Sequence, residues 1–291
     1  MRDGFTDQIE VNLIGSGSSA EGETPMGIRL GGTTFSFMWS EPALATMRRI
    51  GELGLKEFDV IMAPGHLWPD ELDGAARRRL RQELAQDGLR VESTNLPALD
   101  FNLGSCLPEV RAYAIGRYAD ALRLSADLGG RGVVTVPGRV SGLLPPDRDD
   151  TLSWLGDSVE ALLKVADETG QDLLLETHPQ TAIASAEAMV AFVETFGHAR
   201  LLVAYDVANA EFIGEDQAEA IRRLQPMLAQ VHLSDATRTS WKHDRAGLGT
   251  VRFDRVRAAL EEIDFGGVAI IEVISPDTLP DTKATIEAWG A

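Results

Sequence analysis

The 291-residue chain has a formal net charge of −18, from 45 acidic and 27 basic residues, and 44% of its residues are hydrophobic. This composition is typical of a globular protein and excludes overall disorder, while the acidic excess disfavours binding to the phosphate backbone of nucleic acids. The single cysteine excludes an internal disulfide and any zinc site built from several cysteines.

Residues 1–25 contain the run Gly-Ser-Gly-Ser-Ser-Ala-Glu-Gly-Glu and are predicted to form a flexible tail, with Met26 as an alternative start. This segment lacks the apolar core of a signal peptide, and no apolar run in the chain approaches the ~20 residues of a membrane span. We therefore expect no membrane association and a cytoplasmic location. A homo-oligomer is left open.

From residue 26 to residue 291, short apolar runs rich in β-branched residues alternate with segments of helical period. The predicted strands are residues 27–35, 57–63, 89–95, 131–137, 172–177, 200–206, 229–234 and 268–273. The predicted helices are residues 41–52, 70–87, 107–129, 151–169, 183–196, 216–225, 252–263 and 280–289. This alternation predicts an α/β fold, a (β/α)8 TIM barrel that forms a single domain over residues 26–291. No Gly-x-Gly-x-x-Gly follows the first strand, which disfavours an open dinucleotide-binding sheet.

Four successive predicted strands end in side chains that can bind a metal: Glu176, Asp206, His232 and Glu272. The carboxyl ends of barrel strands form one rim, and neighbouring strands lie about 4.8 Å apart, so these side chains are expected to converge. Taken singly, Asp206 is explained by a helix cap and His232 by a satisfied core histidine. Together, three ionised carboxylates need a compensating cation, because like charges at short range raise each other's pKa.

The expected ligand set contains three carboxylates and one imidazole, so most of its donor atoms are hard oxygens. Such a set suits Mn²⁺ or Mg²⁺, and the histidine makes Co²⁺ compatible as well. A structural zinc site would be closed and richer in sulfur or nitrogen. We expect one divalent ion, with Mn²⁺ preferred, and open coordination positions for water or substrate.

These motifs resemble those of the sugar phosphate isomerase/epimerase family, the xylose isomerase-like TIM barrels that also include endonuclease IV. The matching segments are Glu176-Thr-His178, Asp206-Val-Ala-Asn209, His232-Leu-Ser-Asp235, Arg238, His243-x-x-x-Gly247-Leu-Gly249 and Ile271-Glu272. The resemblance implies that Glu176, Asp206, His232 and Glu272 bind one divalent ion. In the ketose-epimerase branch it also implies that the two glutamates move protons.

The same resemblance implies a substrate-binding role for Arg238, which stands six residues beyond His232. It places His178 and His243 in the substrate pocket, and we assign Asn209 to substrate binding as well. His66 follows the second predicted strand and is a further substrate-binding candidate, with a surface-loop role as the alternative.

The expected function is isomerisation or epimerisation of a sugar, sugar acid or polyol ketone, so the expected partner is a small carbohydrate. Glu176 and Glu272 would be the catalytic residues, removing and returning a proton beside a carbonyl through a metal-stabilised enediolate. The alternative is a dehydratase of the inosose or dehydroshikimate type on the same scaffold. A third hypothesis, a sugar-binding barrel without turnover, would not need two proton-transferring glutamates.

A nuclease of the endonuclease IV type is disfavoured, because it needs a trinuclear cluster with additional histidines. The chain has five histidines, and Asn209 and Trp241 stand where those nucleases have ligands. Two other features are ambiguous. Gly247-Leu-Gly249 could cradle a phosphate or form a turn, and Asp235 could hold Arg238 or cap a turn.

Overall fold

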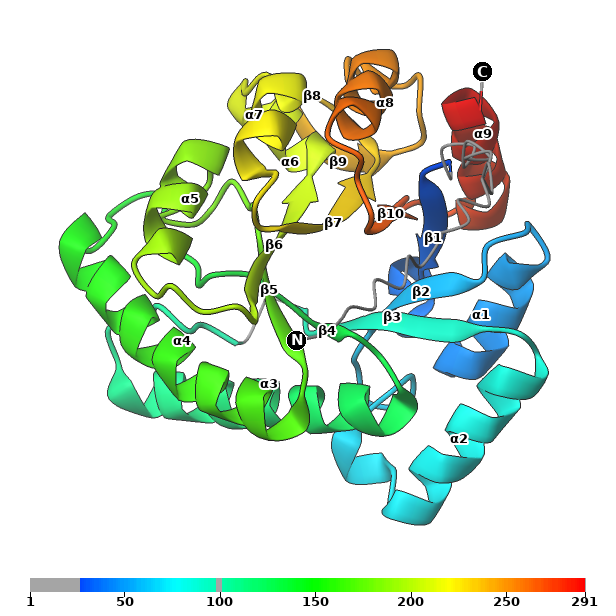
Figure 1. Ribbon diagram of the computed structural model, residues 1–291, viewed down its shortest axis with the longest axis horizontal. Coiled ribbons are helices and arrows are strands. Elements are labelled where there is room, and N and C mark those ends of the chain that lie inside the picture. The colour runs from blue at the N-terminus through cyan, green and yellow to red at the C-terminus, as the bar shows by residue number, and fades with distance from the viewer. Residues whose placement is uncertain (1–26, 98–100, 291) are drawn as a thin grey trace, which may run out of the picture.

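A closed barrel of parallel strands forms the centre of the computed structural model, which describes residues 27–97 and 101–290 (Figure 1). Its strands are β1 (Arg29–Thr33), β2 (Glu57–Ile61), β3 (Arg90–Asn95), β4 (Gly132–Thr135), β5 (Asp172–Glu176), β6 (Leu201–Asp206), β7 (Leu228–Leu233) and β10 (Val268–Ile271). Each strand pairs in parallel with its neighbours in this order, and β10 pairs with β1 to close the barrel. The predicted (β/α)8 barrel is therefore confirmed, while the predicted tail, residues 1–25, lies outside the described residues.

Helices surround the barrel on its outer side (Figure 1). They are α1 (Ala43–Gly51), α2 (Gly74–Gln86), α3 (Pro108–Leu128), α4 (Arg148–Thr169), α5 (Ala186–Glu194), α6 (Val207–Ile213), α7 (Gln217–Leu224), α8 (Phe253–Glu262) and α9 (Thr278–Gly290). The two longest end at Gly129 and Gly170, which have φ angles of 83° and 70°. Glycine adopts this left-handed conformation without a steric penalty, so it ends a helix and turns the chain back toward the next strand. None of the helices in the described part of the chain is both long and apolar enough to cross a membrane.

The segment that follows β6 and the segment that follows β7 contain elements that the periodicity did not predict. Helix α6 begins directly after β6, and a two-stranded antiparallel hairpin, β8 (Asp235–Thr237) and β9 (Ser240–Asp244), follows β7. The last barrel strand is also shorter than predicted, so Glu272 lies one residue beyond β10. These differences all fall on the rim where the strands end, which is where the side chains of the candidate site lie.

Side chains alternate along each strand between the helical layer and the barrel interior. Phe58, Leu175 and Tyr205 belong to the main core between the strands and the helices. At alternate positions, Val134 and Leu174 belong to a small separate apolar cluster within the barrel. The same alternation directs the last residues of β5 and β6 into the barrel mouth, because Glu176 follows Leu174 by two positions and Asp206 follows Ala204 by two.

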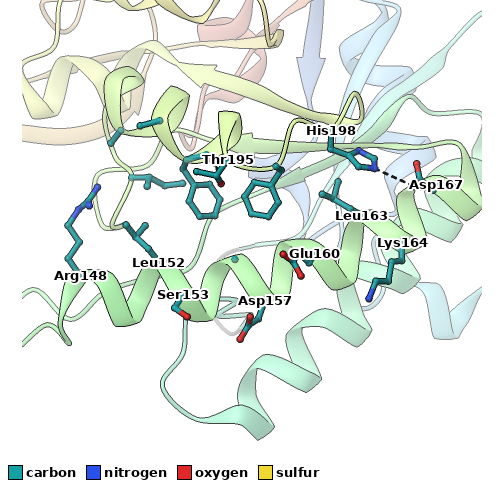
Figure 2. A pocket seen from close by; sticks show the side chains of 16 residues that line it. Arg148, Leu152, Ser153, Asp157, Glu160, Leu163, Lys164, Asp167, Thr195 and His198 are labelled. Atoms are coloured by element: carbon teal, nitrogen blue, oxygen red, sulfur yellow. Dashed lines mark hydrogen bonds and ion pairs between the residues drawn. The ribbon is translucent and has the colours of Figure 1, made fainter.

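A groove lies between α4 and α5 on the outside of the barrel (Figure 2). It encloses about 810 Å³ and is lined by apolar residues such as Phe192 and Phe196 and by charged residues such as Glu160, with a hydrogen bond between His198 and Asp167 at one end. None of the candidate metal-binding residues lines it. It is a hollow of the helical layer and plays no part in the candidate site.

The core between strands and helices should account for most of the stability of the fold. Leu122 on α3 is fully buried, whereas Leu143, in the loop before α4, is 96% exposed. We expect Leu122→Ala to lower the free energy of unfolding by about 2–5 kcal/mol, because it leaves a cavity in the core. Leu143→Ala removes the same atoms from water-exposed surface and should change it by less than about 0.5 kcal/mol. Urea denaturation of the two variants measures the difference, and equal effects would contradict this assignment of the core.

Candidate metal centre

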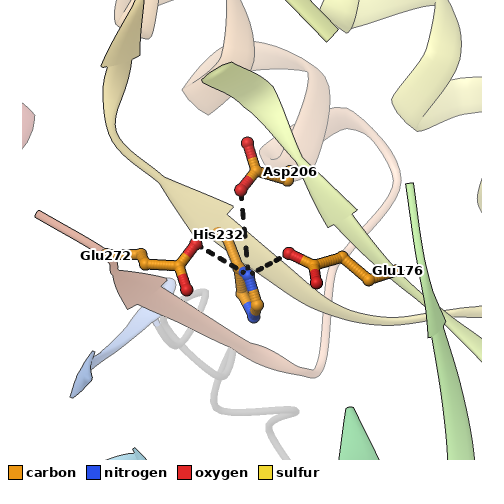
Figure 3. A group of neighbouring side chains, drawn as sticks. All are labelled: Glu176, Asp206, His232 and Glu272. Atoms are coloured by element: carbon orange, nitrogen blue, oxygen red, sulfur yellow. Dashed lines mark hydrogen bonds and ion pairs between the residues drawn. The ribbon is translucent and has the colours of Figure 1, made fainter. Parts of the chain in front are cut away.

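The carboxyl ends of β5, β6, β7 and β10 bring four polar side chains to one place in the barrel mouth (Figure 3). Glu176 and Asp206 are the last residues of β5 and β6, His232 lies on β7, and Glu272 directly follows β10. Each of the four offers one ligand atom, and these atoms all lie within 4.8 Å of one another. The four side chains that the sequence singled out at successive strand ends therefore share one centre.

The imidazole of His232 lies among the three carboxylates (Figure 3). Its Nδ1 atom lies 3.0 Å from Glu176 Oε1, 3.2 Å from Glu272 Oε2 and 3.9 Å from Asp206 Oδ2. The four residues are between 0% and 5% exposed, so water screens these charges little. The cluster is therefore a strongly charged group inside the protein.

Burial and mutual repulsion change the protonation of the carboxylates. Burial, followed by the charges of Glu272 and Glu176, raises the pKa of Asp206 to about 7. Burial alone would also raise the pKa of Glu272, but the neighbouring His232 imidazole lowers it to about 2. Burial would lower the pKa of His232, yet the adjacent glutamates raise it well above its ordinary value. Each of these groups is therefore far from its behaviour in water.

Two buried carboxylate oxygens indicate what the centre can hold. Asp206 Oδ2 and Glu272 Oε2 accept no hydrogen bond within the described parts of the chain. A buried carboxylate oxygen normally has a hydrogen-bond donor or a cation as its partner. Three carboxylates and one imidazole nitrogen also match the ligand types of divalent cations that prefer oxygen donors. The residues of this centre therefore fit one divalent ion.

Asp206 uses its two carboxylate oxygens differently. Its Oδ1 accepts a hydrogen bond of 2.7 Å from the backbone N–H of Asn209 and so caps the N-terminus of α6. Its Oδ2 faces the cluster. The helix cap that the sequence offered as an alternative to a metal ligand is thus present, and it leaves the second oxygen available.

His243 is the predicted pocket residue that the structure brings nearest to the cluster. It lies on β9, and its Nδ1 is 3.4 Å from Glu272 Oε2 and 3.6 Å from Asp206 Oδ2. The same nitrogen also lies 3.0 Å from the Ser234 hydroxyl oxygen. The hairpin that follows β7 therefore adds a second imidazole to the edge of the centre.

His178 also lies at the rim, two residues beyond Glu176. Its ring meets the Trp241 ring edge to face, with 5.0 Å between the ring centroids. Its Nδ1 accepts a hydrogen bond from the backbone N–H of Gln180, and burial, followed by the Arg139 charge, lowers its pKa to about 4. At neutral pH, His178 is thus uncharged and carries its proton on Nε2, where it can act as a hydrogen-bond donor.

The other three predicted substrate-binding residues have protein partners in the structure. Asn209 donates to the Thr177 carbonyl and accepts from Trp241 Nε1 at 2.7 Å. The two ring nitrogens of His66 contact the Glu41 carbonyl oxygen and the Thr34 hydroxyl.

Arg238 is exposed in the turn of the β8–β9 hairpin and donates to the Gly214 carbonyl at the end of α6. Its guanidinium lies against that glycine. The structure brings neither Arg238 nor His66 into direct contact with the centre, and Asn209 touches it only through its backbone N–H, which donates to Asp206. The substrate-binding roles of these three residues stay predictions.

Asp235 organises the loop behind His243. Its two carboxylate oxygens accept hydrogen bonds from the backbone N–H groups of Ala236, Gly247, Gly249 and Val251. A Cβ atom at Gly249 would lie 2.2 Å from the Ala236 carbonyl oxygen, so only glycine fits there. The amides of Gly247 and Gly249 are therefore used within the protein, which supports the turn and not the phosphate cradle.

A clamp on the opposite side of the mouth had no clear signal in the sequence. Asn102 donates to the carbonyl of Arg139 and accepts from its backbone N–H. The Arg139 guanidinium in turn donates to the Gln180 side-chain oxygen at 2.7 Å. These contacts tie together the loops that follow β3, β4 and β5, and only the fold brings them to one place.

Replacing Asp206 by Asn should stabilise the metal-free protein, because it removes one of three buried negative charges and keeps the oxygen that caps α6. In the presence of EDTA, we expect the variant to have a free energy of unfolding about 1 kcal/mol higher than that of the wild-type protein and a Tm about 2–4 °C higher. The pKa of Asp206 is raised from 3.8 to about 7 in the folded state, so ionisation of this group lowers the free energy of unfolding of the wild-type protein as pH rises between these values. The advantage of the variant should be small near pH 4 and largest above pH 7.

Asp216→Asn is the matched control, because Asp216 caps α7 in the same way but lies near the surface and has a lowered pKa. It should not raise the Tm at any pH. A Tm for Asp206→Asn that is no higher than that of the wild-type protein at pH 8 would contradict the predicted repulsion.

Comparisons with known proteins agree with this architecture. Residues 47–289 match the family described as xylose isomerase-like TIM barrel. The D-psicose 3-epimerase of Agrobacterium fabrum is 24% identical over 243 residues, which cover 80% of each chain.

Two solved structures share the fold over nearly the whole chain. A structure of L-ribulose 3-epimerase has a TM-score of 0.77 at 21% identity, covering 90% of this chain and 93% of the other. The D-psicose 3-epimerase of Clostridium cellulolyticum H10, solved with D-tagatose, also has a TM-score of 0.77, at 17% identity, covering 90% of this chain and 98% of the other. Because the family match spans most of the barrel, this chain belongs to the xylose isomerase-like TIM barrel family.

Proposed function

We propose that this protein is a divalent-metal-dependent epimerase or isomerase that acts on a small ketose sugar. The observation that carries the proposal is the convergence of three buried carboxylates and one imidazole at the barrel mouth, with two carboxylate oxygens left without a hydrogen bond in the described chain. The relatives with the same fold are named as epimerases of psicose and ribulose, which supports a ketose as substrate.

Glu176, Asp206, His232 and Glu272 would hold the cation, with Mn²⁺ preferred because most donor atoms are carboxylate oxygens. When bound, a divalent ion would polarise a carbonyl and an adjacent hydroxyl oxygen and offset the negative charge that develops as the neighbouring proton leaves.

Glu176 and Glu272 are suited to move this proton. They approach the centre from opposite sides of His232 (Figure 3), because they lie at the carboxyl ends of strands β5 and β10, which are not adjacent in the barrel. One carboxylate can remove the proton from one face of the substrate, and the other can return a proton to the opposite face. Return to the same carbon gives epimerisation, and return to the adjacent carbon gives isomerisation.

Two further side chains would orient the sugar. The Nε2–H of the neutral His178 can donate to a hydroxyl group without adding charge to the site. Trp241 is held by its hydrogen bond to Asn209 and offers a rigid apolar surface beside His178. Asn209 would thus act on the pocket by positioning Trp241.

A dehydratase on the same scaffold is not favoured, because the relatives described above are named as epimerases. A trinuclear nuclease centre is not favoured either, because the described residues contain a single group of side chains that could hold a metal. A cytoplasmic location and a homo-oligomer stay predictions.

Removal of the cation should abolish turnover. After dialysis against EDTA, we expect no interconversion of D-psicose, D-tagatose or L-ribulose with its epimer, and addition of Mn²⁺ should restore it. The measurement is chromatography of the sugar products, with Mg²⁺ and Co²⁺ added in parallel to compare cations. Full activity in the chelated protein would remove the cation from the mechanism, and a product that has lost water would favour the dehydratase.

Replacing Glu272 by Gln should stop the exchange of the substrate α-proton with solvent, because the amide cannot take up a proton at neutral pH. We expect a loss of at least about 100-fold in exchange rate, the usual size of a general-base contribution. The measurement is ¹H NMR of a ketose in D₂O with the Mn²⁺-treated protein, after removal of the paramagnetic ion. Glu160→Gln makes the same chemical change on the exposed outer side of α4 and should exchange at the wild-type rate. Exchange that continues in Glu272→Gln would refute its role.

A further inference from the structure

Below the candidate metal centre, a line of polar side chains crosses the barrel interior from β2 to β7. It contains Asp59 on β2, Ser93 and Asn95 on β3, and Gln230 on β7, two residues before His232. None of these four residues is more than 4% exposed, and His232 is fully buried. Buried polar groups of this kind are costly unless they are hydrogen-bonded, so their contacts define what the line does.

The contacts form a continuous chain. The Ser93 hydroxyl oxygen lies 2.6 Å from Asp59 Oδ1 and 3.0 Å from the side-chain oxygen of Gln230. The side-chain nitrogen of Gln230 lies 2.9 Å from Nε2 of His232. Asn95 closes the far end by donating from Nδ2 to Asp59 Oδ2 at 3.0 Å.

The single hydroxyl hydrogen of Ser93 determines how the side-chain amide of Gln230 is oriented. Ser93 has one hydroxyl hydrogen, yet it faces two acceptors, the Asp59 carboxylate and the Gln230 oxygen. The two ends of a carboxamide have nearly the same shape, so a rotation of 180° keeps every distance and exchanges the oxygen and nitrogen. The Gln230 nitrogen then donates to Ser93, Ser93 donates to Asp59, and each of these contacts pairs one donor with one acceptor.

This orientation fixes the histidine. The Gln230 oxygen now faces Nε2 of His232 and can accept its proton, so a neutral imidazole keeps its lone pair on Nδ1. Nδ1 is the nitrogen that faces Glu176 and Glu272, at 3.0 Å and 3.2 Å. A metal-binding histidine must offer a lone pair to the ion, and its other nitrogen is usually held by an outer hydrogen bond.

We propose that Asp59 acts through Ser93 and Gln230 as a positioning residue that keeps the proton of the candidate metal-binding histidine on Nε2. The negative charge of Asp59 sets the donor-to-acceptor direction of the hydrogen bonds that run through Ser93 and Gln230, because a carboxylate can only accept hydrogen bonds. The geometry around Asp59 supports this form, since Asn95 and Ser93 both donate to it. Burial raises the pKa of Asp59 to about 6, so the carboxylate predominates at pH 7 and above. The proposal rests on the proposed function only in taking His232 as a ligand of the cation.

The direct test is the proton position in the wild-type protein. With ¹⁵N-labelled histidine and Mg²⁺, which is diamagnetic, NMR should show His232 protonated on Nε2 and bare on Nδ1. His232→Gln identifies its signals among the five histidines. A proton on Nδ1 of the Mg²⁺-loaded protein would overturn the proposal.

The second test is the affinity for Mn²⁺, measured by calorimetry on Asp59→Asn and Ser93→Ala. We expect each variant to bind Mn²⁺ about 10- to 100-fold more weakly, the usual effect of losing an outer hydrogen-bond partner of a metal ligand. Thr94→Val is the matched control, because it removes a hydroxyl from the same strand, and that hydroxyl is buried without a hydrogen bond to the described residues. Its affinity should equal that of the wild-type protein.

The outcomes separate this proposal from the proposed function. If the wild-type protein binds Mn²⁺ and both variants bind it with the wild-type affinity, the hydrogen-bond series from Asp59 to Gln230 has no positioning role and the metal centre stands. If the wild-type protein does not bind Mn²⁺, both proposals fail. Loss of affinity in Thr94→Val as well would show a general loss of structure in β3 and would overturn the specific role of Ser93. Asp59 lies on β2, so Asp59→Asn tests its role independently of β3.

Discussion

The repulsion among three carboxylates buried in the barrel mouth is the constraint on which the rest of the site depends. Glu176, Asp206 and Glu272 are at most 5% exposed, and one imidazole stands between them. A single positive charge cannot neutralise three negative ones at these distances. Burial, followed by the charges of Glu272 and Glu176, raises the pKa of Asp206 to about 7. The four residues are compatible with one divalent cation, which would offset this excess of negative charge.

The barrel geometry makes this arrangement easy to build. The residues of neighbouring parallel strands lie in register, so Asp206 stands beside His232 and the inward side chains of β5, β6 and β7 reach the same region. The strands supply the frame, while the loop after β5 supplies His178 and the β8–β9 hairpin supplies His243. The contacts among Asn102, Arg139 and Gln180 hold the loops on one side of the mouth, and the backbone hydrogen bonds to the Asp235 carboxylate hold the loop behind His243.

Much of this could be predicted from the sequence, because the main signals are local. An apolar run that ends in Glu176 or Asp206 defines both the strand and the direction of its last side chain. The positions of Arg238 and Asn209 could not be predicted in this way. Arg238 is placed by the turn of an unpredicted hairpin, and Asn209 is held by Trp241, which lies 32 residues further along the chain. Gln230 and Asp59 did leave a signal, since each is a polar residue inside an apolar strand, but only the closed barrel brings them together.

The two carboxylate oxygens of Asp206 separate the support of α6 from the binding of a cation. One oxygen holds the first turn of α6, and the other is aimed at the cluster, so the two tasks do not compete for the same lone pairs. The hydrogen bond that caps α6 therefore does not depend on an occupant of the cluster, so the first turn of this helix keeps its anchor whether or not a cation is present.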